Sequence, residues 1–226
     1  MSTPPPALST SSSDLPELRL KPREERRIAG GHLWIFSNEV DTARTPLTAF
    51  ATGAHCRVVA SNDRFLGYAY VNPHALICAR ILGRDPGFTP GKSLIVHRLQ
   101  VALALREKLY AQPFYRLVYG ESDGLPGLVL DRFGDIVVGQ IGTAGMEAMK
   151  AVIAEAVVKV LGPKALIWKN DSSARELEDL PELLRQGEAD LVVLDKELER
   201  EGVIAEFLGF EENVLVRVHS ECLTGD

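Results

Sequence analysis

The sequence has little cysteine, no long apolar run and no surplus of positive charge. Its three cysteines, Cys56, Cys78 and Cys222, are widely spaced and form no CxxC pair, which argues against a disulfide framework and a self-sufficient zinc site. No window reaches eighteen consecutive apolar residues, and the N-terminus has neither a basic start nor an apolar stretch, so a membrane span and a secretory signal are not expected. We expect a cytoplasmic protein that binds no membrane, with Cys56 and Cys78 as buried, inert thiols.

The formal net charge of -6 is unevenly distributed. Residues 1–120 carry 15 Lys and Arg against 9 Asp and Glu, a balance of +6, whereas residues 121–226 carry 10 against 22, a balance of -12. Because a polyanion meets a local, screened field, a basic half joined to an acidic half is typical of a nucleic-acid binder attached to a part that does not touch nucleic acid. Chance variation in solvated surface charge explains the asymmetry equally well.

The N-terminal part of the chain predicts a small β domain over residues 18–85. Residues 1–17 are rich in Pro, Ser and Thr and predict a disordered tail. A basic stretch, a Gly-Gly break and an apolar-aromatic run then predict a strand, a short helix with a basic face, a turn and a strand. Further strands are predicted over 55–60, 64–70 and 75–81. Short strands at this spacing favour an antiparallel or barrel-like arrangement.

The central part, residues 92–185, predicts an α+β sandwich. Apolar residues at helical spacing predict one helix over 93–111 and a second over 149–160, with Thr143 as its N-cap. Four strands are predicted in the same region, at 115–119, 127–131, 135–141 and 164–168. Residues 186–226 form an acidic segment, and the stretch from about 173 to 212 has mostly helical propensity.

Two stretches resemble one known family: LKPREERRIAGGHLWIFSNEV at 20–40 and YRLVYGESDGLPGLVLDRFGDIVVGQ at 115–140. They are similar to the N-terminal and central domains of the class I methyltransferases that make 5-methylcytosine in the large ribosomal RNA. That family is built from a PUA domain, a small α/β linking domain and a Rossmann-like catalytic domain that binds S-adenosylmethionine. The resemblance covers roughly residues 18–180 and implies a PUA-like β-barrel, a linking domain, and structured RNA, in particular ribosomal RNA, as the partner.

The expected RNA contacts are the cations of the first domain. Cations crowded beside a turn stay solvated and release counterions on meeting phosphate, although a solvated helix face would carry the same residues. His32 either contacts RNA or caps the turn. Trp34 and Phe36 are interpreted as core, because small β domains need large apolar side chains, which argues against RNA stacking on them. The candidate RNA-binding residues are Lys21, Arg23, Arg26, Arg27, His32, Arg80 and Arg84.

The segment Gly120–Gly127 places two carboxylates close together, as acid–base chemistry often requires. Gly, Pro, Ser and Asp at this density also form a tight loop in which Asp side chains bond to their own backbone amides. We interpret the segment as structural and assign no catalytic residue.

A methyltransferase domain of this class needs a Gly-rich turn after its first strand, an acidic residue at the end of the second strand and a catalytic-loop cysteine. Residues 181–226 hold none of these signatures. The sequence therefore predicts that the Rossmann-like methyltransferase domain is absent, that the chain alone is inactive and that it requires no cofactor of its own.

The last residues carry a second resemblance. The stretch VRVHSECLTGD at 216–226 resembles the GTP cyclohydrolase II signature of riboflavin synthesis. The resemblance implies that Arg217 and Glu221 occupy nucleotide-contact positions and that Cys222 occupies the first of three zinc-ligand positions. A catalytic zinc site needs three protein ligands, so Cys222 alone predicts no metal site. A truncated or fused protein related to cyclohydrolase II is the alternative interpretation.

Overall fold

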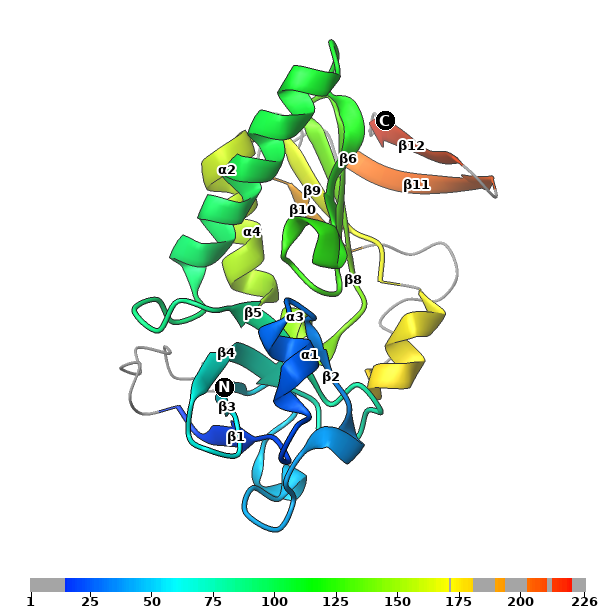
Figure 1. Cartoon of the computed structure of the whole chain (residues 1–226). Coiled ribbons are helices and arrows are strands. Elements are labelled where there is room, and N and C mark those ends of the chain that lie inside the picture. The colour runs from blue at the N-terminus through cyan, green and yellow to red at the C-terminus, as the bar shows by residue number, and fades with distance from the viewer. Residues whose placement is uncertain (1–14, 171, 181–189, 194–202, 211–212, 221–226) are drawn as a thin grey trace, which may run out of the picture. The chain divides into compact units, whose positions relative to one another are not determined.

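The computed structural model describes residues 15–170 and 172–180, together with the backbone of three segments, 190–193, 203–210 and 213–220. The chain divides into two compact units, residues 1–90 and 91–226 (Figure 1). The predicted disordered tail falls largely on residues outside the described part of the chain, and its last residue, Glu17, begins the first strand.

Five strands form the sheet of the first unit: β1 (Glu17–Arg19), β2 (Trp34–Ile35), β3 (His55–Val59), β4 (Phe65–Val71) and β5 (Ala79–Gly83). Their order is β1-β3-β4-β5-β2, with β1 parallel to β3 and the other neighbours antiparallel. An antiparallel bridge from Leu20 to Val40 joins the segments that follow the two edge strands, as in a partly closed barrel. The short 3-10 helices η1 (Ser37–Glu39) and η2 (Leu47–Ala49) complete the unit.

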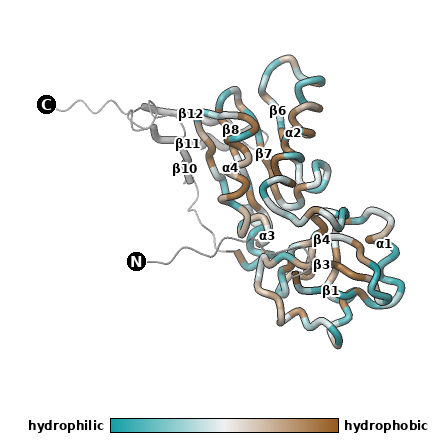
Figure 2. The backbone as a smooth tube through the Cα atoms, turned by 90° about the vertical axis from the view of Figure 1, so that its left-hand side faces the viewer, coloured by the Kyte–Doolittle hydropathy of each residue, from teal (hydrophilic) through white to brown (hydrophobic). Residues whose placement is uncertain are grey.

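The basic stretch of the sequence forms the short helix α1 (Glu25–Ala29). Ile28 is its buried residue, and Figure 2 shows the tube as hydrophilic at α1 and more hydrophobic in the strands. Gly31, with φ 108, makes the turn after the helix in a backbone conformation that suits glycine. The predicted order of strand, short basic helix, glycine turn and strand is confirmed.

The core of the first unit lies on one face of the sheet, because successive side chains of a strand point to opposite faces. Leu18, Ile35 and Ile81 are fully or almost fully buried there, together with Cys56 and Cys78. Burial raises the pKa of the Cys78 thiol to about 12 and also raises the pKa of Cys56. Both thiols therefore stay protonated near neutral pH and are poor nucleophiles, as the sequence predicts.

The strand predicted over 75–81 is displaced toward the C-terminus and begins at Ala79. The cause is a turn at Asn72, whose side-chain Oδ1 accepts a hydrogen bond from His74 N at 3.1 Å and whose carbonyl accepts one from Ala75 N. An Asx turn of this kind competes with strand pairing. It leaves Leu76 exposed, although the residue belongs to an apolar run.

The second unit contains a sheet with the order β10-β9-β8-β7-β6. Its strands are β6 (Phe114–Tyr119), β7 (Leu128–Phe133), β8 (Ile136–Ile141), β9 (Ala165–Trp168) and β10 (Asp190–Val193). Its helices are α2 (Lys92–Leu109), α3 (Ala144–Ala148) and α4 (Lys150–Leu161), and α2 and α4 lie side by side (Figure 1). The predicted meander and both predicted helices are confirmed.

The last connection of the sheet differs from a meander. Strand β9 runs parallel to β8, so α3 and α4 form a crossover between them.

The ends of the two helices are formed in different ways. Thr143 occupies the N-cap position of α3 and makes no side-chain capping bond. Gly162 ends α4 in the left-handed conformation, with φ 53.

The mostly helical prediction for residues 173–212 is wrong in its described part. A 3-10 helix, η4 (Ser173–Glu178), is followed by β10 and by β11 (Val203–Phe210), which pairs antiparallel with β12 (Asn213–Ser220). Pairing explains the difference, because a β-branched run such as that of β10 can add to the edge of an existing sheet, and strand partners override local propensity.

Candidate nucleic-acid interface

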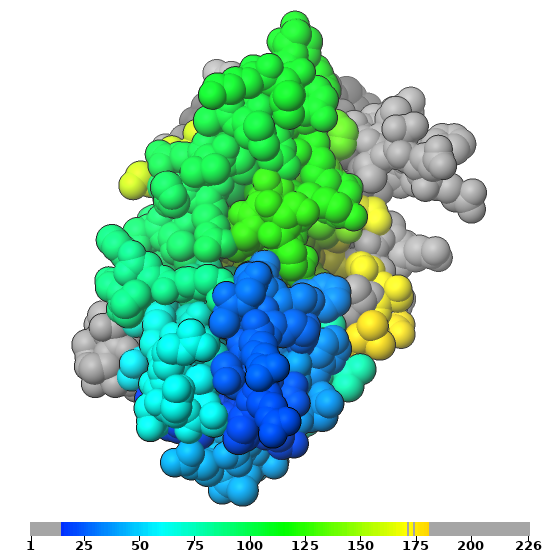
Figure 3. Space-filling view, viewed as in Figure 1, coloured from blue at the N-terminus to red at the C-terminus, as the bar shows by residue number. Residues whose placement is uncertain are grey.

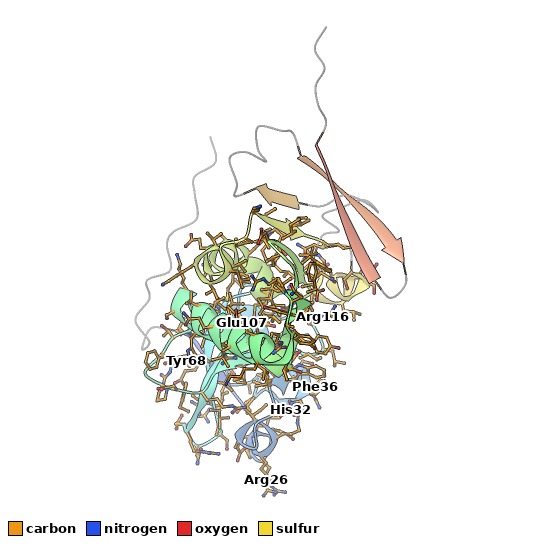
Figure 4. The ribbon with its side chains drawn as sticks, turned by 90° about the horizontal axis from the view of Figure 1, so that it is seen from above. Arg26, His32, Phe36, Tyr68, Glu107 and Arg116 are labelled. Carbon is orange, nitrogen blue, oxygen red and sulfur yellow. The ribbon has the colours of Figure 1, made fainter. Side chains whose placement is uncertain are left out.

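Three cations of the basic stretch, Lys21, Arg23 and Arg26, are exposed. Lys21 Nζ donates a hydrogen bond to the carbonyl of Asn38 at 2.7 Å. Figure 4 shows Arg26 at the outer edge of the first unit, and Figure 3 shows the dark blue N-terminal residues at the surface of one face. Arg23 has a left-handed backbone with φ 79, an uncommon conformation for a residue with a side chain.

Arg27 is placed differently, since it is held by a carboxylate. Its Nη2 lies 2.6 and 2.8 Å from the two carboxylate oxygens of Glu39, and its Nε lies 3.2 Å from Oε1. Glu39 is buried and also accepts a hydrogen bond from Phe36 N at 2.7 Å. The Arg27 guanidinium further lies 5.2 Å from the centre of the Phe36 ring. Arg27 therefore fastens α1 to the segment that contains β2 and η1.

His32 bonds within its own turn. Its Nδ1 accepts a hydrogen bond from Trp34 N at 3.2 Å and lies 2.9 Å from Arg27 Nη1. With two donors directed at Nδ1, the geometry assigns the ring proton of neutral His32 to Nε2. His32 therefore caps the turn, which is one of the two roles that the sequence allowed. The residue is also exposed.

The two candidate arginines at the end of the sheet differ in exposure. Arg84 is exposed and donates to two carbonyls, Leu66 O at 3.3 Å and His32 O at 2.9 Å. Partial burial lowers the pKa of Arg84 from its ordinary value, which still leaves an arginine charged. Arg80 is buried on β5, directly opposite Trp34 in the strand register.

Trp34 is not a core residue, contrary to our interpretation of the sequence. Its exposed fraction is 36%, whereas that of its neighbour Ile35 is 0%. The alternation of strand side chains correctly places Trp34 and Ile35 on opposite faces. It does not decide which face is buried, and here the core takes Ile35.

The loop Gly120–Gly127 has the structural role predicted for it. Arg106 grips both carboxylate oxygens of Asp123 at 2.7 and 2.8 Å, and Asp123 also accepts a hydrogen bond from Tyr119 N at 2.7 Å. Arg98 donates to the carbonyl of Gly124, which has a φ of 72. These contacts use the Asp123 carboxylate to shape the turn.

The glycine-rich stretch after β8 is the described place most similar to a nucleotide-binding turn, because it lies between two parallel strands. Within β8 itself, a Cβ atom on Gly139 would collide with the Trp168 ring, so this glycine makes room for a side chain of the chain itself. At the strand end, Ile141 N donates to Asn170 Oδ1 at 2.8 Å, and Arg175 Nη1 donates to Ile141 O at 2.7 Å. The backbone at the end of β8 is therefore bonded to the chain's own side chains, and we assign none of its residues to S-adenosylmethionine.

No group of three or more His, Cys, Asp or Glu side chains suited to a metal ion occurs in the part of the chain that the structure describes. Cys222 and Glu221 lie outside that part, and only the backbone of Arg217 is described, in β12. Within the same limits, no helix is both long and apolar enough to cross a membrane.

The chain is similar to known proteins in both sequence and fold. Residues 18–84 match the family model of a PUA-like domain. The chain is 34% identical over 152 residues to ribosomal RNA large subunit methyltransferase I of Aliivibrio fischeri, a match that covers 66% of this chain and 38% of that protein. It is thus homologous to the large-subunit ribosomal RNA methyltransferases, and its matches span 38 to 47% of the length of such relatives.

Two solved structures share the fold. One is a proposed S-adenosylmethionine-dependent methyltransferase from Streptococcus mutans, with a TM-score of 0.62 and 13% identity over 85% of this chain and 46% of that one. The other is a proposed methyltransferase in complex with S-adenosylhomocysteine, with a TM-score of 0.59 and 16% identity over 69% of this chain and 40% of that one.

These likenesses correct two expectations. The chain shares its fold with methyltransferase chains over most of its length, so the prediction that the methyltransferase fold is absent is wrong. The expectation that no cofactor is involved is overturned by the neighbour that contains S-adenosylhomocysteine. Both errors arose because sequence motifs were required, whereas fold similarity rests on the arrangement of strands and helices. The resemblance to cyclohydrolase II gains no support from the comparisons.

Proposed function

We propose that this protein acts in S-adenosylmethionine-dependent methylation of a cytosine in the large ribosomal RNA, and that residues 18–84 bind the RNA. S-adenosylmethionine would supply the methyl group. We assign no step of methyl transfer to the described residues, because the backbone at the end of β8 is already bonded to Asn170 and Arg175.

The observation that carries the RNA-binding role is the charge of Arg23 and Arg26. Both are exposed, and neither forms an ion pair with any described residue. Each can replace condensed counterions on a phosphate without first breaking a bond to a carboxylate. The PUA-like match and the ribosomal RNA methyltransferases among the relatives support RNA as the polyanion.

Arg27 supports this surface from within. The Arg27–Glu39 pair fixes α1 against η1 and so limits the conformations that the exposed cations sample. Less conformational entropy is then lost on binding. The candidates of the basic stretch thus divide into Lys21, Arg23 and Arg26, which face solvent, and Arg27, which holds the helix in place.

The test replaces Arg23 and Arg26 together by Ala and measures binding to a structured fragment of large-subunit ribosomal RNA over a range of salt concentrations. The matched control replaces Arg44 and Arg64, two exposed arginines of the same unit that form no ion pair with described residues. We expect the Arg23/Arg26 variant to weaken binding and to make the log–log salt slope shallower by about two units. The control variant should retain most of the parent's log–log salt slope.

Equal losses of RNA affinity in both double variants would show that any two positive charges of the first unit contribute alike. That result would contradict the placement of the RNA surface. Unchanged binding in the Arg23/Arg26 variant would contradict it as well. Circular dichroism checks that each variant is folded, which we expect because exposed charges away from packed sites usually change stability by only about 0.5 kcal/mol.

A further inference from the structure

The ring of Trp34 is exposed, yet the backbone around it is fixed by side chains. Trp34 N donates to His32 Nδ1 at 3.2 Å, and Trp34 O accepts from Arg27 Nη2 at 3.1 Å. The His32 ring stands edge-on to the Trp34 ring, with 6.0 Å between centroids and 77° between planes (Figure 4 shows His32 and Phe36). An exposed aromatic ring on a fixed backbone loses little conformational freedom when a flat partner covers it.

A positive charge without an acidic partner in the described part of the chain is anchored two residues before Trp34. Arg84 bonds to the carbonyl of His32, two residues before Trp34, and to that of Leu66. Neither acceptor is a carboxylate, and Arg84 makes no ion pair within the described residues. Arg84 is therefore anchored in position while its full charge remains available to an anion.

We infer that Trp34 stacks on an unpaired base of the RNA and that Arg84 contacts a phosphate next to that base. The inference rests on the RNA-binding function proposed above and specifies the class of RNA that this site selects. Every base offers a flat face, so stacking on an aromatic side chain tolerates many sequences. A base inside a duplex is already stacked on both sides and is not available, so the site favours loops, bulges and single strands.

A protein partner fits these residues less well. The core of a protein interface is depleted in charged residues, whereas the side chains that bond to the backbone of His32 and Trp34 are His32, Arg27 and Arg84. An exposed ring whose neighbouring backbone carbonyls are held by guanidinium groups instead combines the two features that single-stranded nucleic acids bind, namely a stacking surface and a positive charge.

The chain offers an internal reporter for the test, because it contains two tryptophans, of which Trp168 has an exposed fraction of 1%. Titration with an unpaired RNA oligonucleotide should quench the fluorescence of Trp34, and the Trp34→Phe variant should lose this response. A fully paired RNA duplex of the same length should quench much less. Equal quenching by both RNAs would overturn the preference for unpaired bases.

Affinity measurements complete the test. We expect Trp34→Ala to weaken binding of the unpaired oligonucleotide by about tenfold to a hundredfold with an unchanged salt slope, because stacking is not ionic. Trp34→Phe should retain part of the affinity. Arg84→Gln should make the salt slope shallower by about one unit, whereas Arg64→Gln serves as the matched control.

If Trp34→Ala binds the unpaired oligonucleotide as tightly as the parent, the stacking inference is overturned. The RNA-binding function is then judged separately by the Arg23/Arg26 variant. Loss of binding in that variant together with an unchanged Trp34→Ala would leave the first proposal standing and remove only the second.

Discussion

Both units contain arginines that are held by carboxylates, and the first unit also contains exposed arginines that have no acidic partner among the described residues. In the second unit, Arg106 is paired with Asp123, Arg116 with Asp131 and Arg175 with Glu147. In the first unit, Arg23 and Arg84 have no acidic partner within the described part of the chain. The balance of charge does not show this difference, since residues 1–90 carry 10 Lys and Arg against only 8 Asp and Glu.

Under the proposed function, the local partner of a cation, more than the net charge of its domain, decides whether that cation is available to RNA. A guanidinium that is held by a carboxylate stabilises the fold and must leave its partner to meet a phosphate. An exposed guanidinium with no acidic partner contributes little to stability and is available for binding. Substitutions in the two units should therefore separate stability from RNA affinity.

The largest expected effect comes from breaking a paired arginine of the second unit. Asp123→Ala would leave Arg106, whose side chain is 14% exposed, without its carboxylate and would remove the acceptor of Tyr119 N. We expect the free energy of unfolding to fall by about 3 kcal/mol. Urea denaturation followed by Trp168 fluorescence, in a Trp34→Phe background, measures this in the unit that carries the change.

The matched control for this prediction is the exposed pair Asp135 and Lys164, whose side chains are 66% and 57% exposed. Asp135→Ala should cost less than about 1 kcal/mol, because exposed ion pairs contribute little. Similar losses for Asp123→Ala and Asp135→Ala would mean that the Arg106 pair does not hold the loop, and the contrast between paired and unpaired arginines would lose its energetic basis.

A smaller effect is expected when a paired arginine of the first unit is released. Glu39→Gln keeps the size of the side chain and removes the charge that holds Arg27. Arg27 is more exposed than Arg106, at 37% of its side chain, so water can solvate the released charge. We expect a loss of about 1 to 2 kcal/mol in the free energy of unfolding.

RNA binding by the Glu39→Gln variant also tests the contrast between paired and unpaired arginines. A released Arg27 can meet a phosphate, so the log–log salt slope should become steeper by up to about one unit, a gain in affinity that the loss of the fixed α1 opposes. A shallower slope would indicate that Arg27 already contacts RNA in the parent protein and that its pairing with Glu39 does not withhold it.

The sequence predicts much of this fold because its local signals agree with the final pairing. Gly162 followed by Pro163 correctly predicts the end of α4, and the turns that separate the central apolar runs correctly predict β6, β7 and β8. Failures occur where a distant partner decides. Strand β10 joins a sheet edge although the surrounding acidic stretch has helical propensity.

The sequence predicts which charged residues form the candidate site, but it does not predict how the fold arranges them. The order of residues brings Arg23, Arg26 and Arg27 together, yet only the fold places buried Glu39 against Arg27. The exposure of Trp34 was missed because alternation in a two-residue strand does not indicate which face is the core. The hydrogen bond from Arg84 to His32 joins residues 52 positions apart, and no local sequence pattern predicts it.

The smallest expected effect concerns two histidines, one in each unit. His55 lies on β3 opposite Tyr70, and burial lowers its pKa from the ordinary value near 6.5. His97 lies on the exposed side of α2. Because the folded state of the first unit disfavours protonated His55, the unfolded state binds more protons as the pH falls below about 6.5. The contribution of neutral His55 is thus fully present above that pH and is lost as the pH falls toward the lowered pKa.

We expect His55→Gln to flatten this part of the stability profile, with a smaller difference in unfolding free energy between about pH 7.5 and about pH 5.5 than the parent shows. His97→Gln, at an exposed histidine of the second unit, serves as the matched control. Urea denaturation of all three proteins at both pH values gives the comparison, and carboxylate titrations common to all of them cancel in the differences. If His55→Gln and the parent lose stability in parallel, burial of His55 does not couple the first unit to pH.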